Sequence, residues 1–332
     1  MKPKNADIKI KTTYRKKYCQ PDSIEIREIP FPVPKDDELL VQIKASTVNR
    51  TDEGVLLGKP KVFRLFVGFP QPRLTATGTD FSGVVIDTGK AVSGFKKGDE
   101  IYGFHDLGLG THSEYVCISV HKPILHKPSN ISHEEAAASL EGAHYAYFFL
   151  NKISLPKNCR VMVNGATGAI GNAVVQLLIE RGARVTFTYP TDSYDKIKHL
   201  KAEHMIDYLK EDFTQQDRLF DFVLDAVGKS SFAACKRIMK PHAAYISSEL
   251  GPQGENIPLS LLGFFKKGKR VIFPFPGHPK KSMTAIKPLL ENKTFQPLID
   301  CVYPFAKIRH AYRYMLTGQK RGNIIIAIND KV

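Results

Sequence analysis

The stretch NGATGAIGNAVVQLL, at Asn164–Leu178, places three glycines directly after the strand-like run RVMV and at the start of a run with helical periodicity. Gly165 permits a tight turn, Gly168 lets backbone N–H groups approach a pyrophosphate, and Gly171 lets the helix pack on the strand. We therefore predict a dinucleotide-binding turn; the alternative is a tight turn without a ligand. Its predicted binding residues are Gly165, Ala166, Thr167, Gly168, Ala169, Ile170 and Gly171.

Strand-like and helix-like segments alternate around this turn. The predicted strands are Arg160–Ala166, Arg184–Tyr189, His204–Tyr208, Phe220–Val227, Ala243–Ser248 and Arg270–Phe275. The predicted helices are Ala169–Arg181, Asp192–Leu200, Ser230–Met239 and Ile257–Lys266. Strands that alternate with helices of this length predict an α/β fold with a parallel, doubly wound sheet, and six strands suit its dinucleotide-binding form.

The chain before about Lys127 has a different pattern. Short runs of alternating polarity, such as SIEIREI and LLVQIKAS, are broken by glycine and proline and predict a small antiparallel β-barrel. No run with a 3.6-residue period and the length of a helix interrupts them. Ser132, with Glu135 three residues later, then predicts a capping box that opens an alanine-rich helix.

The C-terminal tail completes the predicted organisation. It contains two helical stretches, Ser282–Asn292 and Ala306–Thr317, and the strand NIIIAI. Because that strand has no helix-linked parallel partner, we expect it to return to the barrel, which makes the nucleotide domain an insertion. The predicted domains are a barrel domain, 1–127 with 276–332, and a nucleotide domain, 128–275.

Composition bounds the function classes. The 332 residues are 42% hydrophobic and 24% charged, which excludes disordered, collagen-like and disulfide-scaffold proteins. No apolar run approaches the roughly 18 residues of a membrane span, and the N-terminus lacks the apolar core of a signal peptide, so we expect a cytoplasmic protein without a membrane partner. The five cysteines are scattered and predicted to be reduced. The sequence contains no nucleic-acid-binding motif, so we interpret the net charge of +15 as a solvated basic surface.

The tip of the second predicted strand bears on the choice of cofactor. A carboxylate at this position would bind the ribose hydroxyls of NAD, but the strand ends in Thr188 and Tyr189. This favours NADPH over NADH, although Asp192 follows and Lys196 and Lys198 lie on the next helix. Tyr208 either packs against the 2′-phosphoribose or is simply an aromatic residue at a strand end.

Six motifs in order resemble the medium-chain dehydrogenase/reductase superfamily over nearly the whole chain. They are NRTDEG (Asn49–Gly54), GTDFSGVV (Gly78–Val85), FKKGDEIYGF (Phe95–Phe104), VNGATGAIG (Val163–Gly171), FDFVLDAVG (Phe220–Gly228) and GNIIIAI (Gly322–Ile328). The resemblance implies a Rossmann sheet inserted in a GroES-like β-barrel catalytic domain.

The presence or absence of zinc-ligating residues indicates which branch of the superfamily the chain resembles. Zinc-dependent members carry a Cys shortly before the Thr-Asp of the first motif, a His-Glu pair after the glycine that opens the second motif, and a loop of four closely spaced cysteines. This chain has Val48-Asn49-Arg50 and Thr79-Asp80 at the first two places and lacks the cysteine loop. The chain therefore resembles the zinc-free quinone oxidoreductase branch. His105 and His112 flank one short loop and are interpreted as surface residues rather than metal ligands.

A site without a Lewis acid favours acceptors that delocalise charge themselves. We expect NADPH-dependent hydride transfer to a quinone or an α,β-unsaturated carbonyl. The alternatives are an alcohol dehydrogenase or enoyl reductase of the same superfamily, or a non-catalytic member that binds NADPH or RNA. Val55-Leu56-Leu57 stand where enoyl reductases of the superfamily usually place a tyrosine, which disfavours acyl thioesters.

Three residues are candidates for catalysis. Asn49 matches the asparagine of the barrel motif and would face the nicotinamide or the substrate oxygen; alternatively it caps a loop. Asp52 is expected to cap the turn. His144 either orients the cofactor or delivers a proton, or it is a buried structural histidine, and Tyr145 is a weaker candidate.

The resemblance implies further cofactor contacts at the ends of other strands. These are Thr188, Tyr189, Tyr208, Ser247, Phe273, Phe275 and Asn323. The segment around Phe273–Phe275 would hold the carboxamide and commonly pairs across a dimer, so we expect a homodimer. The apolar segment Pro60–Phe69 either roofs a pocket for a small hydrophobic electrophile or belongs to the core.

Overall fold

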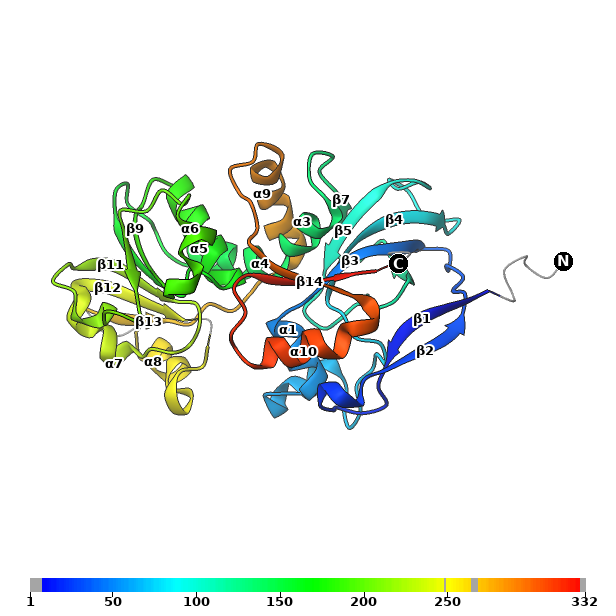
Figure 1. Ribbon diagram of the computed structural model, residues 1–332, viewed down its shortest axis with the longest axis horizontal. Helices are drawn as coiled ribbons and strands as arrows, with labels where there is room; N and C mark the ends of the chain where they lie inside the picture. The colour runs from blue at the N-terminus through cyan, green and yellow to red at the C-terminus, as the bar shows by residue number, and fades with distance from the viewer. Residues whose placement is uncertain (1–7, 248, 264–267, 329–332) are drawn as a thin grey trace. The chain divides into compact units, whose positions relative to one another are not determined.

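The computed structural model describes residues 8–247, 249–263 and 268–328, and the chain divides into two compact units. Unit 1 comprises Met1–Glu141, His278–Glu291 and Ile299–Val332, and unit 2 comprises Gly142–Gly277 and Asn292–Leu298. In Figure 1 the blue, cyan and red segments belong to unit 1 and the green and yellow segments belong mainly to unit 2. Unit 1 is thus made from both ends of the chain, with unit 2 inserted between them.

Within the described residues, unit 1 is built on a seven-stranded sheet of order β14-β15-β3-β4-β5-β7, in which β6 also pairs with β3. The strands are β3 (Glu38–Val48), β4 (Asp80–Thr88), β5 (Glu100–Phe104), β6 (Tyr115–Ser119), β7 (Ile124–His126), β14 (Ile299–Pro304) and β15 (Asn323–Ala327). A separate ribbon pairs β1 (Lys9–Tyr14) with β2 (Glu25–Pro30). Apart from the parallel pair β14 and β15, the pairings are antiparallel, as the alternating runs predicted. Leu39, Val41 and Ile43 on β3 are fully buried in the core.

Two short helices in this part of the chain were not predicted. They are α1 (Arg50–Leu57) and α2 (Arg64–Val67). α1 begins with a capping box: the Asn49 side chain accepts a hydrogen bond from the Asp52 backbone, and the Asp52 side chain accepts one from the Asn49 backbone. Eight residues are too few for a helical period to stand out, so the cap was the available signal.

The alanine-rich helix after Lys127 belongs to unit 1. α3 (His133–Ala138) starts at the predicted capping box of Ser132 and Glu135 and contacts β3, β4 and β15 through its small residues. Residues from 128 onward were predicted to belong to the nucleotide domain. Contacts place 128–141 in unit 1 instead, because the buried alanines pack on the barrel sheet.

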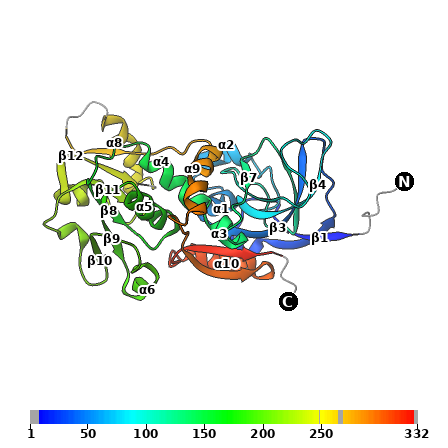
Figure 2. The same cartoon turned by 90° about the horizontal axis from the view of Figure 1, so that it is seen from above.

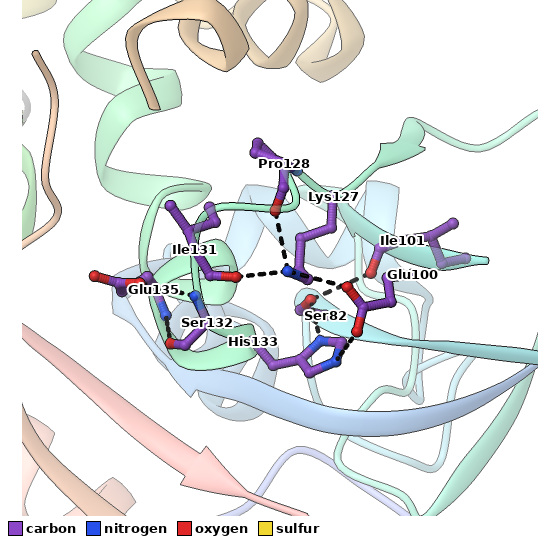
Figure 3. Close-up of polar contacts among 9 residues, drawn as sticks. All are labelled: Ser82, Glu100, Ile101, Lys127, Pro128, Ile131, Ser132, His133 and Glu135. Atoms are coloured by element: carbon purple, nitrogen blue, oxygen red, sulfur yellow. Dashed lines mark hydrogen bonds and ion pairs between the residues drawn. The ribbon is translucent and has the colours of Figure 1, made fainter. Parts of the chain in front are cut away.

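An ion-pair cluster anchors the start of α3 to β5 (Figure 3). The Lys127 side chain is only 4% exposed; its Nζ donates to the Pro128 and Ile131 carbonyls at 3.0 and 2.5 Å and lies 3.2 Å from Glu100 Oε2. His133 Nε2 lies 3.4 Å from Glu100 Oε1. Burial raises the pKa of the Glu100 carboxyl, but Lys127 and His133 outweigh it and lower that pKa overall.

Unit 2 contains a six-stranded, all-parallel sheet among its described residues, in the order β10-β9-β8-β11-β12-β13. The strands are β8 (Arg160–Asn164), β9 (Arg184–Tyr189), β10 (His204–Asp207), β11 (Phe220–Asp225), β12 (Met239–Ser247) and β13 (Arg270–Ile272). The labels β12, β11, β8, β9 and β10 follow one another across the sheet in Figure 2. The parallel, doubly wound α/β fold is confirmed.

The helices of unit 2 differ from prediction mainly in length. They are α4 (Glu141–Leu150), which starts at the unit boundary, α5 (Ala169–Glu180), α6 (Tyr194–Ile197), α7 (Phe232–Cys235) and α8 (Asn256–Gly263). α6 and α7 have four residues each and adjoin short 3-10 turns, so the longer helices predicted there are wrong. β12 already begins at Met239, the last residue of one predicted helix.

The C-terminal tail completes unit 1. α9 (Pro279–Glu291) and α10 (Ile308–Leu316) match the predicted helices closely. β15 pairs antiparallel with β3 and so returns to the barrel as expected. It also pairs in parallel with β14, with α10 between them in sequence, so the expectation that it has no helix-linked parallel partner is wrong. None of the helices in the described residues is long and apolar enough to cross a bilayer.

Candidate nucleotide site and buried polar cluster

The glycine turn after β8 requires glycine for steric reasons. Gly165 has a φ of +94°, and a Cβ there would lie 2.5 Å from Val227 Cγ1. A Cβ on Gly171 would lie 2.0 Å from the Gly165 carbonyl oxygen, so the first turn of α5 touches the backbone that enters it. A Cβ on Gly168 would have ordinary contact only, 3.6 Å from the same oxygen. Gly165 and Gly171 therefore shape the turn, whereas Gly168 leaves space.

A chain of buried polar groups holds this turn in position. The Gly165 backbone N–H donates to Thr188 Oγ1 at 2.8 Å, and Thr188 Oγ1 donates to Asn164 Oδ1 at 2.8 Å. Asn164 Nδ2 donates in turn to Asp225 Oδ1 at 3.0 Å. Three neighbouring strand ends, of β8, β9 and β11, are thus linked. Thr188 was predicted as a cofactor contact; the structure assigns it a hydrogen bond to the turn itself.

Asp225 is a structural anchor that sequence reasoning missed. Its two oxygens also accept hydrogen bonds from the backbones of Val227, Gly228 and Ser230 and from the Tyr245 hydroxyl. The available signal was an aspartate ending the buried run FDFVLD, since polar residues at the carboxyl end of a parallel strand face the ligand-binding edge.

The N-terminus of α5 is suited to bind an anion. Its N-cap residue is Gly168, and in the described part of the chain no side chain caps it. The backbone N–H groups of Ala169, Ile170 and Gly171 lie in this first turn, where a helix presents partial positive charge. The turn therefore fits the pyrophosphate of a dinucleotide.

The tip of β9 lies beside a carboxylate from the next strand. In the parallel register of β9 and β10, Tyr189 lies opposite Asp207, the last residue of β10. The Asp207 carboxylate accepts hydrogen bonds from Thr191 Oγ1 at 2.5 Å and from the Leu209 backbone N–H at 3.1 Å. Lys210 Nζ lies 3.4 Å from the Asp207 carboxylate. Hydrogen bonds lower the pKa of the Asp207 carboxyl, and the largest contribution comes from the Thr191 hydroxyl. The prediction of no carboxylate at the tip of β9 holds for that strand, but Asp207 on its neighbour was missed.

The other predicted cofactor residues of unit 2 lie at different places. Tyr208 is exposed just after β10. Ser247 ends β12, is buried, and its Oγ accepts from the Glu249 backbone. The predicted strand through Phe275 stops at Ile272, so Phe273 and the exposed Phe275 follow it with their rings 5.1 Å apart.

His144 and Tyr145 lie on the first turns of α4, close to the glycine turn. A Cβ on Gly142 would lie 2.8 Å from the Ala169 carbonyl carbon, so α4 packs tightly against the first residue of α5. His144 is 1% exposed and contacts the rings of Tyr145 and Phe148 edge-on. Both the structural and the catalytic interpretation of His144 fit this position.

Asn49 is the centre of a buried polar cluster in unit 1. Its Nδ2 lies 3.0 Å from Thr47 Oγ1 and 2.9 Å from both Thr79 Oγ1 and Asp80 Oδ2, and its Oδ1 accepts from the Asp52 backbone at 2.8 Å. The capping alternative for Asn49 is therefore present in the structure, and the expected capping role of Asp52 is observed. A role of Asn49 toward nicotinamide or substrate stays a prediction.

Three carboxyl groups, Asp52, Asp80 and Glu141, are buried in this cluster. Burial, followed by the charge of Asp80, raises the pKa of Asp52 well above its ordinary range. Burial raises the pKa of Asp80 to about 6 against the opposing hydrogen bonds from Thr47 and Asn49. Burial also raises the pKa of Glu141, which accepts from the backbone and hydroxyl of Thr51. Folding thus favours the protonated forms of these groups.

The interpretation of His112 as a surface residue is wrong. Its side chain is fully buried, with Nδ1 2.8 Å from Thr77 Oγ1 and Nε2 donating to the Thr47 carbonyl at 2.8 Å. Burial lowers its pKa to about 4. His112 therefore supports the polar cluster as a neutral ring. His105 is half-buried, and burial likewise lowers its pKa to about 4.

Asn323 belongs to unit 1 and lies near Asn49 in the sheet. It begins β15, where Ile324 pairs with Val48 at the end of β3. Asn323 therefore lies one residue before this pair, and Asn49, the N-cap of α1, lies one residue after it on the other strand's chain. The other predicted cofactor residues lie in unit 2. Among the described residues no group of three or more His, Cys, Asp or Glu side chains is arranged to hold a metal ion.

Comparison with known proteins identifies the family. The family model of the alcohol dehydrogenase GroES-like domain matches residues 35–129, and that of zinc-binding dehydrogenase matches residues 200–326. The chain is 30% identical over 309 residues to a 2-methylene-furan-3-one reductase of Solanum lycopersicum, covering 90% of this chain and 74% of that protein. It is 25% identical over 309 residues to an NADPH-dependent alkenal/one oxidoreductase of Arabidopsis thaliana, covering 90% and 74%.

A solved structure shows the same fold. The quinone oxidoreductase from Coxiella burnetii superposes with a TM-score of 0.83 at 22% identity, over 97% of this chain and 100% of that one. The glycine turn, the parallel sheet and the GroES-like barrel agree with these relationships. The chain therefore belongs to the medium-chain dehydrogenase/reductase superfamily, in its zinc-free quinone oxidoreductase-like branch, and is an oxidoreductase of a family that uses a nicotinamide cofactor.

Proposed function

We propose that the protein is a zinc-independent, NADPH-dependent oxidoreductase that transfers hydride to a quinone or an α,β-unsaturated carbonyl. The observation that carries the proposal is the self-contained cluster of Asn49, Thr79 and Asp80, which stand where the zinc-dependent relatives carry ligands. Zinc is bound by thiolate, imidazole and carboxylate groups that converge on one point. Here the Asn49 amide donates to both the Asp80 carboxylate and the Thr79 hydroxyl, so this donor set does not suit zinc.

The chemistry of the acceptor follows from that donor set. The nicotinamide cofactor supplies the hydride, and the residues of the protein orient the reactants and exclude water. The charge that arrives with the hydride then has to be delocalised within the acceptor. A quinone or an enone does this because the charge moves to a distant oxygen, whereas an isolated ketone does not. The tomato relative is named a 2-methylene-furan-3-one reductase and the Arabidopsis relative an NADPH-dependent alkenal/one oxidoreductase, and both names support this acceptor class.

The preference for NADPH is proposed from the tip of β9. Asp207, which lies opposite Tyr189 in the neighbouring strand, accepts hydrogen bonds from Thr191 and the Leu209 backbone and pairs with Lys210. It is therefore poorly placed to accept from both ribose hydroxyls of NADH. The Lys210 side chain is 70% exposed and offers a cation for a 2′-phosphate beside Tyr208. Together these groups favour the phosphorylated cofactor.

An acceptor panel tests the proposed reaction. The purified protein is assayed for NADPH oxidation with a quinone, an enone, an unconjugated ketone and an enoyl thioester, before and after dialysis against a zinc chelator. We expect turnover of the quinone or the enone, little with the ketone, and rates unchanged by chelation. Rates that collapse on chelation and return with zinc, or turnover of the ketone alone, would refute the proposal.

A pair of lysine variants tests the cofactor preference. Lys210→Gln should raise the KM for NADPH roughly tenfold, the scale of one charge-assisted contact, and leave the KM for NADH unchanged. Lys198→Gln is the matched control, because Lys198 follows α6 and pairs with Asp195 rather than with Asp207 at the tip of β9. Equal losses with both cofactors, or equal losses in both variants, would contradict a 2′-phosphate contact at Lys210.

His144 is proposed as the residue of α4 that acts on the reacting groups, either by orienting the nicotinamide or by delivering a proton. His144→Phe keeps a flat buried ring and removes both nitrogens. A loss of kcat with an altered pH profile supports proton delivery, and a higher KM for NADPH alone supports orientation. Unchanged kinetics would leave His144 as a structural residue.

The predicted homodimer and cytoplasmic location remain proposals. Relatives with mitochondrial and chloroplastic names occur, so location varies among related proteins. Light scattering of the purified protein measures the oligomeric state, and imaging of a tagged protein in its host measures the location. A monomeric mass or an organellar signal would contradict the respective proposal.

A further inference from the structure

A short segment of unit 1, residues 59–74, exposes many apolar side chains; we call it the apolar loop. The side chains of Val62, Leu65, Phe66, Phe69 and Leu74 are 60%, 65%, 57%, 74% and 41% exposed. The alternative that Pro60–Phe69 belongs to the core is therefore wrong for the four of these residues that lie within it. Single exposed apolar residues are ordinary, but five within 13 positions are a local concentration of the kind found at interaction surfaces.

The apolar loop is held in place by contacts beneath it. The Tyr18 hydroxyl donates to the Gly68 carbonyl at 2.5 Å, and the Arg73 backbone N–H donates to the Val67 carbonyl at 2.9 Å. Val67 is buried, and the Arg64 guanidinium lies over the Tyr18 ring at 4.6 Å. α2, labelled in Figure 2, forms part of the loop. The apolar side chains are thus presented by an ordered turn.

The charge of the apolar loop has one sign. It carries Lys59, Lys61, Arg64 and Arg73, and no aspartate or glutamate occurs between Glu53 and Asp80. None of the four cations forms an ion pair within the described ranges. The whole chain carries a formal charge of +15, so an anionic surface is also favoured at longer range.

We propose that the apolar loop docks on the surface of a lipid bilayer that contains anionic lipids. Leu65, Phe66 and Phe69 would enter the interface between headgroups and acyl chains, while Lys59, Lys61 and Arg73 lie at the level of the phosphates. The combination of exposed aromatic and aliphatic tips with unpaired cations on one segment is the chemistry of a peripheral membrane site.

This departs from the expectation of no membrane partner. That expectation rested on the absence of long apolar runs, which membrane-spanning segments and signal peptides require. The sequence alone did not show which apolar side chains are exposed in a folded turn. The inference does not rest on the proposed function, because it uses only residues of the apolar loop and their charge.

A tryptophan reporter tests the proposal directly, since the chain contains no tryptophan. Phe66→Trp keeps an aromatic side chain in the loop. On addition of phosphatidylcholine vesicles containing about a third phosphatidylglycerol, we expect its emission to shift to shorter wavelength and to be quenched by brominated lipid. Val33→Trp is the matched control, because Val33 is 71% exposed next to Asp36 and Asp37, and its emission should not change.

Vesicle sedimentation of the native sequence supplies the second measurement. Binding should require phosphatidylglycerol, weaken at high salt, and fall at least tenfold in Phe66→Ser/Phe69→Ser, because burial of each ring contributes roughly that factor or more. Val33→Ser/Val302→Ser removes other exposed apolar side chains of unit 1 and should bind normally. If the double phenylalanine variant fails to fold, Lys59→Gln/Lys61→Gln should show the same loss.

Three results would overturn the proposal. The first is native protein that stays in the supernatant with anionic vesicles. The second is equal binding of the loop variants and the controls. The third is an emission shift of the Phe66→Trp variant that appears without lipid as protein concentration rises, which would assign the apolar loop to contacts between copies of the chain.

Discussion

Replacing Gly171 by alanine should damage both the folding of unit 2 and its binding of NADPH. The added Cβ would lie 2.0 Å from the Gly165 carbonyl oxygen and 2.8 Å from its carbonyl carbon. Ordinary contact begins near 3.4 Å, so the two backbone segments would have to separate by roughly 1.4 Å. Neither atom belongs to a flexible side chain that can move aside. The cost should lie at the upper end of overpacking, about 3 kcal/mol.

Two measurements follow from this overlap. For a unit of this size, about 3 kcal/mol should lower the melting temperature by roughly 6–12 °C, as measured by calorimetry or dye-based thermal unfolding. Displacement of the first turn of α5 also moves the N–H groups that face the pyrophosphate. Loss of one charge-assisted hydrogen bond should weaken NADPH binding at least tenfold in a fluorescence titration.

Gly168→Ala in the same turn is the matched control for stability. Its Cβ would lie 3.6 Å from the Gly165 oxygen, and the φ of −81° suits any residue, so the melting temperature without ligand should change by the equivalent of less than about 1 kcal/mol. Its methyl group would instead occupy space next to the pyrophosphate and weaken NADPH binding without unfolding the turn. A Gly171→Ala protein with native stability and affinity would refute the steric argument. Native NADPH affinity in Gly168→Ala would refute the close approach of the cofactor.

Three further variants probe the groups around the two sites. Asp52→Asn should stabilise unit 1 at pH 8 relative to the native sequence and reduce the loss of stability as pH rises above 4, because the pKa of Asp52 is raised well above its ordinary value in the folded state. Urea unfolding at pH 5 and pH 8 measures this, and an unchanged pH dependence of stability would contradict it. Thr188→Val keeps the shape of the side chain but removes the hydroxyl that bonds to the Gly165 N–H and Asn164 Oδ1, so the free energy of unfolding should fall by about 1–3 kcal/mol and the affinity for NADPH should also fall. Urea unfolding and a fluorescence titration measure these two effects, and native NADPH affinity would contradict a role of these hydrogen bonds in positioning the turn. Lys127→Met removes a buried cation that contacts two carbonyls and the Glu100 carboxylate, and it should lower the midpoint of urea unfolding by the equivalent of about 2–4 kcal/mol. An unchanged midpoint would show that these contacts of Lys127 do not contribute to stability.

The glycine turn, the strands of the parallel sheet and the start of α3 could be predicted from the sequence. These features depend on short-range patterns: glycines between a strand and a helix, apolar runs of strand length, and a capping box at Ser132 and Glu135. Local backbone sterics and hydrogen bonding impose such patterns, so they can be read along the chain.

The partners and burial of the polar residues could not be predicted from the sequence. His112, expected at the surface, lies buried between Thr47 and Thr77, and Asp207 reaches the tip of β9 from a neighbouring strand. The hydrogen bonds of Asn49 join residues about 30 positions apart. A side chain's burial, partners and pKa depend on contacts between segments distant in sequence, and the order of residues along the chain does not specify which of those segments meet.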